Sequence, residues 1–201
     1  MKSLICLLVA SAALLGVEPL AGQAVNDFQV RTLAHVQLVP KGRGLGFAGW
    51  GVVPDITQTR SLRGLFVGGI LYRGNGRWVE VMGGGLASRS SVDPILDVRV
   101  SEQSLGKIHG FAAVQHAFKA RRLVAQPIVT TPFTIGQVRV GIGGEADIVL
   151  ALGRLSTARG PRVEIQVPLC KKICKSASFA LAHLFRSDGV RIVRTYFLLN
   201  L

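Results

Sequence analysis

The side chains that could take part in catalysis are histidines with nearby serines. The four histidines of the chain are His35, His109, His116 and His183. A serine hydrolase needs a serine that a histidine can deprotonate. Ser178 and Ser187 lie on either side of His183, but Ser178 is five residues away, so on one strand the two side chains face opposite sides. Neither Gly-x-Ser-x-Gly nor His-Glu-x-x-His occurs, so no catalytic motif is found and a structural role is expected for the histidines.

Two cysteines near the C-terminus could form a disulfide. Cys170 and Cys174 stand in the stretch Cys-Lys-Lys-Ile-Cys-Lys, and a pair of cysteines in an exported chain favours a disulfide that closes a small loop. Free thiols remain the alternative. A metal site needs about four ligands, which this lysine-rich stretch lacks. The sequence therefore predicts no metal and no cofactor.

One glycine motif formally matches a dinucleotide-binding fingerprint. Gly44, Gly46 and Gly49 have the spacing Gly-x-Gly-x-x-Gly, which binds pyrophosphate only where a helix follows. Here Trp50-Gly51-Val52-Val53-Pro54 follows, which does not start a helix. We interpret the glycines as positions where a strand bends.

These side chains must be positioned by β-strands, because apolar residues recur at every second position along most of the chain. In the stretch from Arg162 to Leu169, one face is apolar and the other carries Arg162, Glu164 and Gln166. Asn75-Gly76 predicts a tight hairpin turn. The expected strands cover residues 27–39, 44–53, 62–72, 77–88, 95–101, 108–118, 123–131, 134–150, 162–169, 177–185 and 190–201, with a loop at 153–160.

Composition indicates an environment other than water on one side of this sheet. The 201 residues, enough for one domain, are 49% hydrophobic and 17% charged, whereas soluble domains carry about 25% charged residues. After the N-terminal segment no apolar run reaches the roughly 18 residues of a membrane helix. In lipid the other possible structure is a closed barrel. We predict a single all-β antiparallel up-and-down transmembrane barrel of 10–12 strands, and within this range 10 or 12, because bacterial barrels use even numbers.

The first residues are typical of a secretory signal. Lys2 precedes an apolar run from Leu4 to Val17, and Gly22 and Ala24 are small residues suited to cleavage after Ala24. An N-terminal membrane anchor is the alternative. The expected domains are therefore a signal peptide at 1–24 and a barrel at 25–201.

The last strand resembles the C-terminal signature of outer-membrane β-barrel proteins. Phe197, Leu199 and Leu201 hold its alternate apolar positions, with Leu where the class usually ends in an aromatic residue. The resemblance extends to the signal peptide and the strand pattern. It implies a location in the bacterial outer membrane, contact with its lipid and insertion by the barrel-assembly machinery. It implies no particular activity.

Charged residues on the polar faces predict a lumen network of ion pairs. Five bases and five acids balance each other there, so the net charge of +13 is expected in turns and strand ends. Those cations could meet lipid phosphates or simply extend to the membrane boundary. Nucleic acid is not an expected partner, because the basic residues are scattered. The predicted network is Arg31, Glu80, Asp97, Arg99, Arg139, Glu145, Asp147, Arg162, Glu164 and Arg194.

Four aromatic residues are candidates for the membrane interface, where barrels carry aromatic girdles. They are Trp50, Tyr72, Trp78 and Tyr196, and packing inside the barrel is their alternative position.

Three functions are compatible with these features. The first is a non-enzymatic barrel that is structural or a narrow pore for small solutes. The second is an outer-membrane lipid-modifying enzyme of the lipid A acylhydrolase kind, with His183 and a serine near the membrane edge. The third is a soluble exported β-sandwich that binds a ligand, although the expected strands are longer than the usual five or six residues.

Overall fold

The computed structural model describes residues 27–40, 42–57, 63–105, 107–169 and 174–201. The predicted signal peptide and its cleavage site lie outside the described residues. Every regular element in the described ranges is a β-strand, and none is a helix long and apolar enough to cross a membrane. The strands are β1 (Asp27–Leu38), β2 (Gly44–Val53), β3 (Gly64–Arg73), β4 (Arg77–Ala87), β5 (Val92–Leu105), β6 (Ile108–Ala117), β7 (Arg122–Ile135), β8 (Val138–Ala151), β9 (Arg154–Pro168), β10 (Ser176–Arg186) and β11 (Arg191–Asn200).

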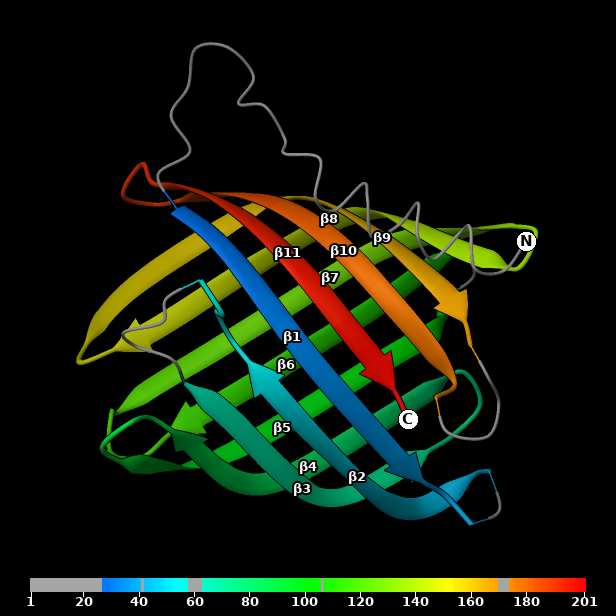
Figure 1. Cartoon of the computed structure of the whole chain (residues 1–201), viewed down its shortest axis with the longest axis horizontal. Helices are drawn as coiled ribbons and strands as arrows, with labels where there is room; N and C mark the ends of the chain where they lie inside the picture. Colours follow the sequence, from blue (N-terminus) through cyan, green and yellow to red (C-terminus); the bar gives the residue numbers. More distant parts are fainter. Residues whose placement is uncertain (1–26, 41, 58–62, 106, 170–173) are drawn as a thin grey trace.

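The strands form one closed barrel in which each pairs with its neighbours in sequence and β1 pairs with β11. Figure 1 shows β1 in blue beside β11 in red, with both arrows pointing the same way. The other pairs are antiparallel, so an odd number of strands forces this one parallel contact. The closed barrel confirms the all-β prediction and rules out the β-sandwich. The even strand number is wrong: the eleven expected segments correspond to eleven strands.

Strand direction defines two mouths of the barrel. We call the end where β1 begins at Asp27 the amino mouth, and the end where β11 finishes at Asn200 the carboxy mouth. The turns after the even-numbered strands lie at the amino mouth, and those after the odd-numbered strands at the carboxy mouth.

Alternation places one set of side chains in the lumen and the other outside. Inward-facing Leu71, Met82 and Leu184 are fully buried, whereas Phe47, Phe66 and Ile70 on the outer face are more than half exposed. Inside, apolar side chains form two clusters: a larger one with Trp50 and Met82 on the β2–β5 side, and one rich in alanine on β9–β11.

The outer face is apolar between the two mouths. Large exposed hydrophobic side chains occur on every strand, from Phe28 on β1 to Phe197 on β11. Charged residues of this face concentrate near strand ends, as Arg77 and Glu102 do. Arg159 on β9 is an exposed exception within a strand.

Two inward-facing glycines allow adjacent strands to curve closely past each other. A Cβ atom at Gly84 would collide with the carbonyl oxygen of Phe66, and one at Gly143 with that of Val129. The neighbouring Gly83 faces outward with no atom within 4 Å of such a Cβ. Curvature therefore depends on the inward glycines.

Between β7 and β9 the observed strand boundaries differ from the expected ones. Residues 134–150 are divided by a turn after Ile135, where Gly136 has φ 62°, and the expected loop at 153–160 is instead the start of β9.

Pro127 lies within β7. The β7–β8 register passes from Ala125↔Ile148 to Ile128↔Glu145, which leaves a gap opposite Pro127, as its missing N–H requires.

Candidate functional site in the barrel lumen

The lumen contains a cavity of about 580 Å³ that reaches both mouths. Arg63 and Arg122 line it at the amino mouth, and Arg73 and Lys175 line it at the carboxy mouth. An eleven-stranded barrel is wider than eight-stranded barrels, whose side chains fill the interior, and narrower than porins with water-filled channels. The space therefore suits small solutes.

Glu80 on β4 is fully buried and accepts hydrogen bonds from side chains of two other strands. Its Oε1 is 2.9 Å from His35 Nε2 and 2.7 Å from Gln37 Nε2, and its Oε2 is 2.7 Å from Trp50 Nε1. The His35 ring stacks on Trp50 with centroids 3.8 Å apart. We call these four residues the Glu80 cluster, in which formally neutral amide and indole groups and an imidazole surround one carboxylate.

An ion pair lies beside the Glu80 cluster on β5. Arg99 donates to both carboxylate oxygens of Asp97, at 2.9 and 2.8 Å, and Gln115 adds a third hydrogen bond at 2.8 Å. The Arg99 guanidinium also lies 4.0 Å from the centroid of the Trp50 ring, a cation–π contact that links the pair to the cluster.

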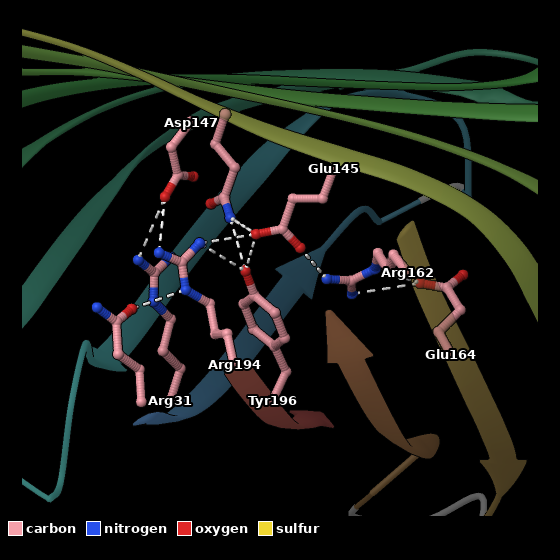
Figure 2. A network of polar contacts seen from close by, with 9 residues as sticks. Arg31, Glu145, Asp147, Arg162, Glu164, Arg194 and Tyr196 are labelled. Carbon is pink, nitrogen blue, oxygen red and sulfur yellow. Dashed lines mark hydrogen bonds and ion pairs between the residues drawn. The ribbon is translucent and has the colours of Figure 1, made fainter. Parts of the chain in front are cut away.

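The opposite wall holds a second buried acid, Glu145 on β8, among guanidinium groups. Figure 2 shows Glu145 between Arg162 and Arg194, with the Tyr196 hydroxyl donating to it as well. Arg162 Nη1 is 2.7 Å from Glu145 Oε2, and Arg194 Nη1 is 2.8 Å from Oε1. Gln126 donates to the same Oε1 at 2.8 Å.

Asp147, two residues further along β8, extends this arrangement. Arg194 Nη2 lies 2.7 Å from Asp147 Oδ2, and Arg31 Nη2 lies 4.0 Å from the same atom. We call Glu145, Asp147, Arg162, Arg194, Tyr196 and Gln126 the Glu145 network. Buried charges need such partners, because desolvation costs each unpaired ion several kcal/mol.

Eight of the ten residues predicted for the lumen network take part in ion pairs. A ninth, Glu80, is hydrogen-bonded to the His35 ring rather than to an arginine. Arg139 lines the cavity but has no ion pair among the described residues. The sequence prediction missed the neutral partners Gln37, Gln115 and Gln126, which share the strand parity of the charged residues and could have been found by that signal.

The predicted charge balance of the lumen is wrong. Arg63, Arg73, Arg122 and Lys175, assigned to turns and strand ends, line the cavity as well. Arg73 and Arg122 share the strand parity of inward-facing Leu71 and Gln126, so alternation could have placed them in the lumen. Long basic side chains at a strand end can also extend inward over apolar surface.

The prediction that four aromatic residues form a girdle at the membrane interface is wrong for three of them. Trp50 and Tyr196 are 6% exposed and face the lumen, and Trp78 lines the cavity. Tyr72 alone of the four is exposed on the outer face, near the carboxy mouth. The polar atoms of Trp50 and Tyr196 find a carboxylate inside, which accounts for their position.

The residues considered for catalysis do not come together. Ser178 lines the lumen, whereas His183 lies between the inward-facing Ala182 and Leu184 and so faces outward. Ser187 Oγ lies in the turn after β10, 3.3 Å from the backbone N of Thr157. Inside the barrel Ser101 Oγ is 3.0 Å from His109 Nε2, but no acid hydrogen-bonds this histidine in the described ranges.

The cysteine prediction stays open. Cys170 lies outside the described residues, and Cys174 Sγ is 3.6 Å from the carbonyl oxygen of Ser176. Within the described part of the chain, no group of three or more His, Cys, Asp or Glu side chains is placed to hold a metal ion.

Comparisons with family models, with curated proteins and with solved structures found no match.

Proposed function

We propose that the chain is an exported outer-membrane barrel whose lumen gives small solutes a narrow passage across the membrane. The observation that carries this proposal is the cavity, whose lining includes residues from both mouths. A purely structural barrel would not need a space that runs from one end to the other.

The outer face supports a position in lipid. Strands of 10–15 residues are long enough to cross a bilayer, which takes about 9–11 residues when tilted. Soluble proteins rarely expose contiguous apolar surface, yet large hydrophobic side chains are exposed on every strand here. A closed barrel leaves no unpaired sheet edge in lipid.

Fractionation tests the location. We expect the protein to stay in carbonate-washed outer membranes, to migrate differently on a gel before and after boiling, and to begin at Val25 when sequenced from the N-terminus. Release into the periplasmic extract would contradict the proposal.

Planar bilayers test the passage. Purified barrel should give discrete conductance steps, and Ala113→Trp should reduce them, because Ala113 lines the cavity. Ala112 faces the opposite side of β6, so Ala112→Trp is the matched control and should conduct like the wild type. Absence of steps in correctly folded protein would leave the structural role.

A lipid-modifying activity finds no specific support. The one serine–histidine contact among the described side chains, Ser101 with His109, faces the lumen rather than the lipid. Mass spectra of lipid A from cells with and without the protein should be identical.

A further inference from the structure

The wall of the cavity carries far more positive than negative charge. Eight cations line it: Arg31, Arg63, Arg73, Arg99, Arg122, Arg139, Arg162 and Lys175. Glu164 is the one acid in the same lining. The cations are present along the whole path, since Arg99 and Arg162 lie near the middle of β5 and β9 and the others lie toward the two mouths.

The other lumen acids are hidden behind this lining. Glu80, Asp97, Glu145 and Asp147 are all at most 8% exposed, and none of them lines the cavity. Each accepts hydrogen bonds or ion pairs from neighbouring side chains. A solute in the cavity would therefore meet guanidinium groups and the carboxylate of Glu164. The four buried acids are covered and paired, although Oδ1 of Asp147 has no hydrogen-bond partner among the described residues.

The acids do not cancel the positive charge even when all are counted. Among the described residues, with buried Arg194, the lumen holds nine cations against five acids, which leaves four positive charges. The other described acids, Asp27, Asp55, Asp93, Glu102 and Asp188, lie at strand ends or in turns and do not line the cavity.

Five of the cavity cations make no ion pair with any residue that the structure describes. They are Arg63, Arg73, Arg122, Arg139 and Lys175. Arg122 feels the positive charges of Arg63 and Arg31 and, more weakly, the negative charge of Asp147. The buried Nε of Arg31 has no hydrogen-bond partner in the described part of the chain either. Like charges left unpaired in a narrow, low-dielectric cleft attract ions of opposite sign.

We propose that the lumen selects and binds small anionic solutes of the carboxylate or phosphate class. This inference deepens the passage proposed above and rests on it for the conduction measurement only. The arginine side chains of the cavity wall suit such solutes, because a guanidinium group binds a carboxylate or phosphate through paired hydrogen bonds.

The first experiment measures ion selectivity in planar bilayers under a potassium chloride gradient. We expect the reversal potential to show chloride permeating about tenfold better than potassium, the low end of electrostatic focusing. A variant that combines Arg63→Gln, Arg73→Gln, Arg122→Gln and Arg139→Gln should lose most of this preference. Cation preference or no preference in the wild type would overturn the inference while leaving the passage intact.

A matched variant controls for total charge. Arg43→Gln, Arg77→Gln, Arg154→Gln and Arg159→Gln remove the same four charges from exposed positions outside the cavity, and selectivity should remain close to that of the wild type. Equal loss in both variants would show that surface charge, rather than the cavity, sets the preference, which also overturns the inference.

A second experiment does not depend on conduction. Isothermal titration of the detergent-folded barrel with inorganic phosphate should show binding that the cavity variant loses and the exterior variant keeps. If the barrel binds phosphate but does not conduct, the passage fails and the anion site stands. If the wild type binds no phosphate, the binding site is refuted.

Discussion

On the β1–β4 wall Glu80 is held by an amide, an indole and an imidazole. On the β7–β11 wall Glu145 is held by two guanidinium groups as well as a phenol and an amide. The side chains around them differ in the same direction. Trp50, Met82 and Leu71 pack beside the first acid, and alanines such as Ala180 and Ala182 pack near the second.

The difference shows two ways of keeping a carboxylate inside a barrel. Where large apolar side chains fill the space, dipolar donors satisfy the acid. Where the wall is made of small residues, long arginines fill the space and bring their charge with them. Removing the acid therefore leaves little behind on the first wall. On the second wall it takes one buried counter-charge from each of two arginines, so that among the described residues Arg194 keeps only Asp147 and Arg162 keeps only Glu164 as an ion-pair partner.

The largest expected loss of stability comes from a feature of both walls, the inward-facing glycines where neighbouring strands pass closely. Gly84→Ala on β4 and Gly143→Ala on β8 should each destabilise the barrel by about 4 kcal/mol or more, since the new methyl group meets a neighbouring backbone carbonyl. Gly83→Ala and Gly144→Ala are the controls, because a Cβ there has no contact closer than 3.5 Å. Urea unfolding of refolded protein measures this, and similar stability in all four variants would contradict the curvature argument.

The next effect separates the walls. Glu145→Gln should cost about 3–5 kcal/mol of unfolding free energy, because Arg162 and Arg194 lose their shared buried counter-charge. Glu80→Gln should lower the free energy of unfolding by only about 1–3 kcal/mol. This substitution disturbs hydrogen bonds from Gln37 and Trp50, but it leaves no guanidinium group without its partner. Equal losses in urea titrations would show that the two walls do not differ as described.

The smallest effect lies outside both walls, in the turn between β10 and β11. Hydrogen bonds from Arg186, at 2.8 and 2.7 Å, lower the pKa of the Asp188 carboxyl from 3.8 to about 2. Because the folded pKa is the lower one, ionised Asp188 stabilises the turn above about pH 4, and this contribution disappears as the pH falls toward 2. The pair is exposed, so the contribution is small.

Comparison of the wild type with Asp188→Asn measures that contribution. The urea concentrations at which half of each protein is unfolded should differ slightly at pH 6 and coincide near pH 2. At pH 6 this difference should be much smaller than the difference between the Glu145 and Glu80 variants. A gap between wild type and Asp188→Asn that grows on acidification would have the wrong sign.

Alternation in the sequence was sufficient to predict eleven strand segments and to predict that the charged residues on their polar faces point inward, although it misplaced the ends of β7, β8 and β9. It was also sufficient to place Trp78 and Tyr196, which share parity with Glu80 and Arg194 and so had to face the lumen with them. Trp78 and Tyr196 were predicted to lie at the membrane interface, whereas Glu80 and Arg194, two residues away on the same strand faces, were predicted to lie in the lumen. In the structure all four side chains face the lumen, as their shared parity requires.

The alternation of residues could not predict how deeply an inward-facing side chain is buried, or which two strands close the barrel. Glu80 and Glu164 both point inward, but one is fully buried and the other lines the cavity, because depth depends on which side chains of distant strands cover each acid. The pairing of β1 with β11 joins residues such as Phe28 and Val193, whose contact no local pattern encodes. An even strand count was therefore assumed from other barrels.

The parallel contact between β1 and β11 also fixes where attached polypeptide would emerge. Eleven strands bring Asp27 and Asn200 to opposite ends of the barrel. If the barrel spans the outer membrane as proposed, a peptide tag placed before β1 and one placed after β11 would occupy different compartments, and an antibody added to intact cells would reach only one of them.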